Sequence, residues 1–334
     1  MDEFTAGHLE AIRRAAERIA ARVRRTPALP GSDLAPQLVL KPELLQPTGS
    51  FKVRGAFNAV LSLLEHDRQP AGVIAVSSGN HGQAVALAAR TTGLACVVVM
   101  PADSNPIKMA AVRALGAEVI SEGITGANRE QRVLEIRAET GLTLVHPFDS
   151  WDVIHGQGTI GLELVDDVPD LGMLVTPVGG GGLISGCALA IKALRPEVQV
   201  VGVEPELAGD AAASKRSGRH ESLPGAPATI ADGLRSLSIG ERGFEVIVGR
   251  GLVDQIVTVT EAEIEAATLT AWTRLHLAVE PSGAVPLAAF LTGRLPRPAA
   301  GRTVLVLSGG NADPALIARL MARPAVPISD APLT

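Results

Sequence analysis

Short apolar runs alternate along the chain with longer segments in which apolar residues recur at helical spacing. The runs are rich in β-branched residues and mostly lack polar alternation; they lie at 72–77, 95–100, 117–121, 142–147, 173–178, 198–205, 255–259 and 303–308. A strand that is apolar throughout is buried on both faces, as in a parallel sheet covered by helices. The pattern therefore predicts an α/β fold with right-handed crossovers and mostly parallel, doubly wound sheets.

The first 25 residues predict an amphipathic helix and not a signal peptide. They start acidic, lack a central apolar region and repeat Ala, Ile and Val at helical spacing. No apolar run in the sequence reaches membrane-spanning length. Cys96 and Cys187 stand in apolar runs without CxxC spacing, so we expect two core thiols and a reducing, cytoplasmic compartment.

Composition and charge favour a small-molecule ligand. The chain has 334 residues, of which 46% are apolar, and this is enough for a substantial core. Its net charge is −5, and no block of Lys and Arg follows the first predicted helix. A nucleic-acid partner is therefore not expected.

The unusual residues follow the predicted strands. Four loops, at 77–83, 179–186, 204–210 and 308–311, are rich in Gly, Ser, Asn or acidic residues. In an open parallel sheet, ligands bind beyond the carboxyl ends of the strands. We therefore expect these loops to meet at one crevice.

The glycine-rich loop predicts an anion site. Gly179 to Gly182 stand between a predicted strand and a predicted helix, where bare N–H groups and the helix dipole favour a phosphate. A tight turn alone would need one glycine. The dinucleotide pattern G-x-G-x-x-G fails, because its third glycine would fall on Ile184 or Ser185, and no G-x-x-x-x-G-K-[ST] occurs. The pattern indicates a phosphate without a nucleotide.

Lys52 is the candidate nucleophile. It stands between Phe51 and Val53, which predicts packed surroundings. Burial disfavours the charged form, lowers the pKa of the amine and makes it a better nucleophile. A buried lysine together with a phosphate cradle points to pyridoxal phosphate, an aldehyde that forms a Schiff base with an amine.

Five motifs then carry a family resemblance: "TGSFKVRGAFNAV", "SSGNHGQA", "PVGGGGL", "TIADGL" and "VLSGGN". In this order they resemble the fold type II pyridoxal-phosphate enzymes, in the branch of serine/threonine dehydratases and serine racemases, from about residue 10 to about residue 315. The resemblance implies a large cofactor-binding domain of residues 1–71 and 149–334, a small domain of residues 72–148, and a homodimer. Because the chain ends soon after the last motif, we expect no C-terminal regulatory domain.

The resemblance assigns the cofactor contacts. Lys52 is implied as the Schiff-base lysine beside Phe51, Asn80 as the partner of the ring hydroxyl, Gly179, Gly180, Gly181 and Gly182 as the phosphate loop, and Ser308 as the partner of the pyridine nitrogen. Asn80 also suits a helix N-cap, and Ser308 a turn at a strand end. A hydroxyl cannot keep the pyridine nitrogen protonated as a carboxylate would, so the ring is a weaker electron sink and β-elimination is favoured.

Two positions bear on the reaction. Ser78 is implied on the face opposite the lysine, where a hydroxyl could exchange the α-proton as a racemase requires, although serine also suits a turn. Phe148 replaces an asparagine of the racemases and favours dehydration. The remaining substrate contacts implied by the resemblance are Ser77, Gly79, His81 and Arg129. Of these, His81 is expected to pack rather than to act as an acid or base, and Arg129 equally suits a solvated helix. We expect a dehydratase for L-threonine or L-serine; a serine racemase or a 3-hydroxyaspartate dehydratase is the alternative.

A cation site is expected on the loop at 204–210. Glu204, Asp210 and the carbonyl of Ala208 offer only oxygen ligands, which suit Mg²⁺ or Ca²⁺, and racemase-like members bind a cation here. Two solvated carboxylates would give the same pattern. Glu204 also lies where a ribose-binding acid would follow a dinucleotide loop, but the glycine pattern for such a loop is missing.

Overall fold

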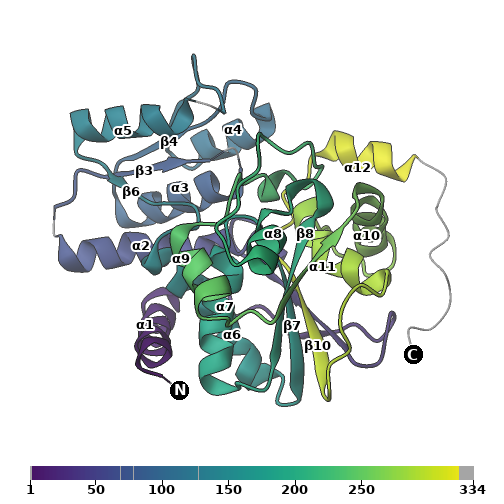
Figure 1. Ribbon diagram of the computed structural model, residues 1–334. Coiled ribbons are helices and arrows are strands. Elements are labelled where there is room, and N and C mark those ends of the chain that lie inside the picture. Colours follow the sequence, from purple (N-terminus) through teal and green to yellow (C-terminus); the bar gives the residue numbers. More distant parts are fainter. Residues whose placement is uncertain (1, 68, 78, 127, 323–334) are drawn as a thin grey trace.

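The computed structural model describes residues 2–67, 69–77, 79–126 and 128–322, which form two sheets with helices on both faces (Figure 1). The larger sheet has the strand order β1-β2-β10-β7-β8-β9, and the smaller has the order β5-β4-β3-β6. Every pair of neighbouring strands is parallel except β1 and β2. The α/β class and the mostly parallel sheets predicted from the sequence are confirmed.

The larger sheet is buried on both faces. Alternate residues of β7 point to opposite sides, so that Leu174 joins one apolar cluster while Met173 and Val175 join the other. Its strands are β1 (Leu29–Pro30), β2 (Leu38–Pro42), β7 (Leu171–Pro177), β8 (Gln199–Pro205), β9 (Gln255–Val259) and β10 (Arg302–Leu307). Helices α1 (Glu3–Ile19), α6 (Trp151–Asp167) and α7 (Gly182–Leu194) cover the first face, and α10 (Glu261–Thr273) and α11 (Pro281–Leu291) cover the second.

The smaller sheet is built from one continuous part of the chain. Its strands are β3 (Val73–Val76), β4 (Cys96–Val99), β5 (Glu118–Ile120) and β6 (Thr143–Leu144). Helices α2 (Lys52–His66), α3 (Asn80–Thr92) and α4 (Pro106–Ala114) contribute to the cluster on one side, and α5 (Arg129–Thr140) to the cluster on the other. The chain enters this part after α2 and leaves it before α6, and these two helices pack together.

Shorter elements complete the described chain. They are α8 (Asp210–Ser217), α9 (Glu241–Phe244), α12 (Pro314–Met321), the single 3-10 turns η1 (Glu43–Leu45), η2 (Glu206–Ala208) and η3 (Asp232–Leu234), and the π-helical turn η4 (Glu245–Gly249). Cys96 and Cys187 are buried free thiols, as expected. Within the described ranges, no helix has the length and hydropathy needed to cross a bilayer.

A network of buried charges lies beneath the start of α2. The Arg54 guanidinium donates to both carboxylate oxygens of Glu43, each at 2.8 Å, and to both of Glu163, at 2.6 and 2.9 Å. Lys41 is fully buried and donates to Glu163 and to the carbonyl of Thr26, each at 2.6 Å. Paired and hydrogen-bonded in this way, the buried charges are tolerated, and they fix α2 against α6 and the edge of the larger sheet.

Candidate active site

Lys52 is the first residue of α2 and is held near the carboxyl end of β10. The Phe51 N–H donates to the carbonyl of Ser308 at 3.0 Å, and Ser50 pairs with Gly309. Lys52 Nζ lies 5.1 Å from the centre of the Phe51 ring and donates to the carbonyl of Pro147 at 2.8 Å. Burial lowers the pKa of Lys52 from 10.5 to about 8. A tenth of these amines are thus neutral about one pH unit below that value, which suits a nucleophile or a base.

The glycine loop joins β7 to α7 and lies against Phe148. A Cβ on Gly180 would stand 2.2 Å from the Phe148 ring, and one on Gly182 would stand 2.9 Å from the carbonyl oxygen of Phe148. Gly181 has φ of 86°, a conformation that favours glycine. Among the described residues, the N–H groups of residues 179–181 have no backbone acceptor. The loop therefore presents unpaired donors at the N-terminus of a buried helix.

Asn80 is fixed by two side chains from the larger sheet's part of the chain. Its Nδ2 donates to Glu280 Oε1 at 2.6 Å, and its Oδ1 accepts from Asn311 Nδ2 at 2.7 Å. The N-cap of α3 is Gly79, so Asn80 is not the N-cap that its residue type also suited. Two partners of this kind set the orientation of the amide.

Glu280 is a site residue that the sequence did not reveal. It is buried, and burial followed by the nearby charge of Asp232 raises its pKa to about 7. A Cβ on Gly309 would stand 2.2 Å from Glu280 Oε1, so this position in "SGGN" must be glycine for the carboxyl to reach Asn80. Glu280 precedes α11 in a mostly apolar stretch, and the only signal was one acidic residue in that stretch.

The predicted substrate residues that the structure describes have different local surroundings. Ser77 Oγ accepts from the Gly79 N–H at 3.1 Å, which shapes the turn before α3. His81 is buried, bonds the Val145 carbonyl at 2.8 Å through Nε2, and has a pKa lowered to about 3 by burial, so its ring is neutral. Arg129 is the first residue of α5, and its Nε is buried without a hydrogen-bond partner among the described residues. Ser78 lies outside the described residues.

The predicted cation ligands lie together at the end of β8. Glu204 is fully buried, and its two oxygens accept from the N–H groups of Ala211 and Ala212 at 3.2 and 2.8 Å. Burial and then the charge of Asp210 raise the pKa of Glu204, and burial raises that of Asp210 to about 6. Asp210 Oδ2 is buried with no partner in the described structure. Across the described ranges, no cluster of three or more His, Cys, Asp or Glu side chains suits a metal.

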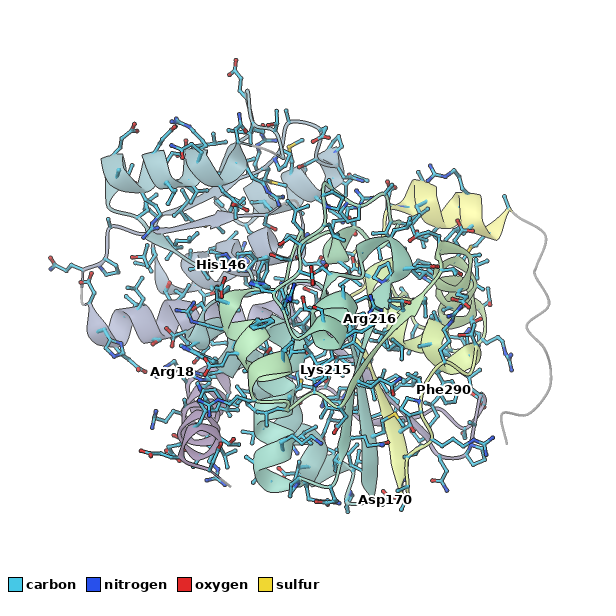
Figure 2. The ribbon with its side chains drawn as sticks, viewed as in Figure 1. Arg18, His146, Asp170, Lys215, Arg216 and Phe290 are labelled. Carbon is cyan, nitrogen blue, oxygen red and sulfur yellow. The ribbon has the colours of Figure 1, made fainter. Side chains whose placement is uncertain are left out.

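Contacts through Phe51, Phe148 and Gly309 connect Lys52, Ser308, Asn80 and the glycine loop. Ser308 follows β10 and bonds Phe51, the residue before Lys52 at the start of α2; the glycine loop follows β7, and Asn80 is the first residue of α3. His146, labelled in Figure 2, lies at the junction between the part with α3–α5 and the part with α6 and α7. Its ring is 4.7 Å from the Phe148 ring in an edge-to-face arrangement. These residues follow the carboxyl ends of the strands, where ligands bind in this topology.

Residues 19–309 match the family described as "Pyridoxal-phosphate dependent enzyme". The chain belongs to this family. Among curated proteins, it is 44% identical to an L-threonine ammonia-lyase of Thermotoga maritima over 285 residues, which are 85% of this chain and 70% of that protein. It is 39% identical to a serine racemase of Oryza sativa subsp. indica over 316 residues, which are 92% of each chain.

Solved structures of the pyridoxal-phosphate family give the same pairing of activities. A threonine deaminase of T.th. is 46% identical, has a TM-score of 0.84, and matches 91% of this chain and 98% of its own. Maize serine racemase is 37% identical, has a TM-score of 0.88, and matches 94% of this chain and 96% of its own. The comparisons thus establish a fold type II pyridoxal-phosphate enzyme, and they support both activities.

The residues present fit the cofactor of the pyridoxal-phosphate family. Unpaired N–H groups at the start of α7 suit a phosphate, and the glycines there leave no room for side chains. An amine with a lowered pKa stands near the same strand ends. Ser308 is buried at the end of β10 and offers a neutral hydroxyl. The donor set therefore matches a phosphorylated aromatic aldehyde.

Proposed function

We propose that the protein is a pyridoxal-phosphate-dependent ammonia-lyase that converts L-threonine or L-serine to a 2-oxo acid and ammonia. The observation that carries the choice is Phe148, whose ring packs on the glycine loop beside the Lys52 site. Where the racemases have an amide, this wall of the crevice is apolar. An apolar wall offers no proton donor or acceptor to the substrate, which favours elimination over exchange of the α-proton.

The cofactor, when bound, supplies an electron-withdrawing ring that stabilises negative charge at Cα of an amino acid. In our proposal Gly179 to Gly182 bind its phosphate through N–H groups, and Asn80, held by Glu280, orients the ring. Ser308 gives the ring nitrogen a hydrogen bond without adding charge. The crevice would take a small amino acid as its only substrate class.

Lys52 is proposed to hold and move the α-proton through Nζ. Its lowered pKa leaves a useful neutral fraction near neutral pH, and the Pro147 carbonyl at 2.8 Å stabilises the ammonium after the proton is taken. The same hydrogen bond orients the Lys52 amine, so that its lone pair points in one direction throughout the reaction.

A panel of amino acids tests the proposal. We expect the purified holoenzyme to release ammonia from L-threonine and L-serine faster than it inverts L-serine. The rate of D-serine formation, measured by chiral chromatography in the same samples, is the control. Inversion faster than ammonia release would favour the racemase, which the rice relative supports by its 92% coverage of both chains. A clear preference for 3-hydroxyaspartate would replace the substrate but not the reaction.

The cation site and the assembly remain part of the proposal. The buried, unpartnered Asp210 Oδ2 and the raised pKa of both carboxylates support Mg²⁺ or Ca²⁺ bound by Glu204, Asp210 and the Ala208 carbonyl. The ion would be structural, since it would order the loop after β8.

We also propose that the chain is divided into a large domain of residues 1–71 and 149–334 and a small domain of residues 72–148. The assembly that we propose is a homodimer.

A further inference from the structure

We propose that Lys108 and Asp232 form a clasp that holds α4 against η3 beside the Asn80 site and thereby sets the affinity for the amino-acid substrate. The two residues form an ion pair between α4, beside the smaller sheet, and η3, beside the larger one. The kinetic test of this inference rests on the proposed function, whereas the hydrogen-exchange test does not.

The clasp has a second point of contact on the same helix end. Asn105, the N-cap of α4, donates from Nδ2 to Asp313 Oδ2 at 3.1 Å, and Asp313 is the N-cap of α12. Each of the two caps also accepts a backbone N–H of its own helix, so both side chains are fixed. Two contacts at one helix end restrain its position better than either could alone.

The ammonium group lies against the loop that leads into α3. A Cβ on Gly79 would stand 3.5 Å from Lys108 Nζ. The next residue is Asn80, whose partner Glu280 feels the charges of both Asp232 and Lys108. Any movement of α4 away from η3 would therefore withdraw a positive charge from Gly79, the residue before Asn80. The clasp thus connects the closure of the crevice to the placement of Asn80.

The exposure of the pair suits a contact that opens and closes. The Lys108 side chain is 11% exposed and that of Asp232 is 41% exposed. A partly exposed pair of this kind contributes on the order of 1 kcal/mol, which corresponds to about a fivefold change in an equilibrium constant. If substrate binds the closed arrangement, loss of the pair lowers the closed population and weakens binding by up to that factor.

The test uses three variants of the holoenzyme and one matched control. Asp232→Asn and Lys108→Met remove the pair, and Lys108→Arg keeps the charge. The control is Asp254→Asn, because the pair of Lys192 with Asp254 is 13% and 41% exposed but lies wholly beside the larger sheet. We expect KM for L-threonine to rise by up to about fivefold in the first two variants, with kcat changed less than twofold, and to stay near wild type in Lys108→Arg and Asp254→Asn.

Hydrogen exchange provides a readout that does not depend on the reaction. In Asp232→Asn the amides of α4 should exchange about fivefold faster than in wild type, while those of α7 stay unchanged. Unchanged exchange in α4, or an equal rise of KM in Asp254→Asn, would overturn the clasp. If α4 exchanges faster but no amino acid releases ammonia, the clasp stands and the proposed function fails.

Discussion

The lowered pKa of Lys52 leads to a prediction about its reactivity in the cofactor-free protein. Burial lowers that pKa to about 8, against 10.5 for an ordinary lysine. The neutral fraction at pH 7 is then about 9%, compared with about 0.03% for an unperturbed amine, a ratio of roughly 300. Lys52 should therefore react with an acylating reagent at pH 7 far faster than a lysine of the unfolded chain.

The assay follows acylation of the peptide that contains Lys52 by mass spectrometry between pH 6 and pH 10. The initial rate should rise tenfold for each pH unit at first and reach half of its plateau near pH 8. The same peptide in denaturant should titrate near pH 10.4 and serves as the matched control. A half-plateau above pH 9.5 in the folded protein would refute the argument that burial tunes this amine.

The same shift has a consequence for stability, with a definite sign. The unfolded chain binds more protons than the folded one between about pH 8 and pH 10.5, so the free energy of unfolding of the cofactor-free protein should rise with pH across that window. The full effect is on the order of 3 kcal/mol, since each pKa unit corresponds to about 1.4 kcal/mol. Lys52→Met should remove this dependence, as measured by urea titration at several pH values.

Four further predictions can be checked with single preparations. Lys52→Ala should abolish ammonia release yet leave circular dichroism and non-covalent cofactor binding unchanged; residual turnover at the wild-type rate would exclude its role. Chelation should lower both the melting temperature and activity, with Mg²⁺ or Ca²⁺ restoring them, and an ion at a hundredfold excess over its Kd would contribute about 3 kcal/mol; Glu204→Ala should no longer respond to chelator. Gly180→Ala should lower the free energy of unfolding by about 1 to 3 kcal/mol because its Cβ would overlap Phe148, and Phe148→Ala should relieve the loss in a thermal melt. Ser78→Ala should retain most ammonia release and lose any racemase activity, and equal loss of both would contradict a role limited to the second face.

The parallel strands could be predicted because a strand that is buried on both faces appears in the sequence as an unbroken run of apolar residues. Strand β2 was not predicted, although all five of its residues are buried. Its run contains Lys41, which looks like a surface residue until its partner Glu163 is known, and that partner lies 122 residues later in the chain. A local pattern cannot show that a charge is neutralised by a distant one.

The candidate site divides in the same way. The lysine, the glycines and the loop with Asn80 stand out because their residue types are unusual at strand ends. Glu280 does not, because its importance comes from contact with Asn80, 200 residues earlier. The glycine loop was interpreted as a ligand cradle alone, whereas the Phe148 ring accounts for the absence of a side chain at Gly180. The sequence indicated that distant loops come together, but it did not disclose the individual side-chain contacts between them.

The buried charges beneath α2 constrain the order in which the chain can assemble during its synthesis. Glu163 is made 109 residues after Arg54, its hydrogen-bond partner. At about 5 to 20 residues per second, the ribosome needs roughly 5 to 20 s for that stretch. Until then the guanidinium lacks one of its two carboxylates, and an incompletely paired buried charge is costly. Helix α2 therefore cannot take its final packed position until α6 has been synthesised. The strands of the smaller sheet are synthesised between these two helices.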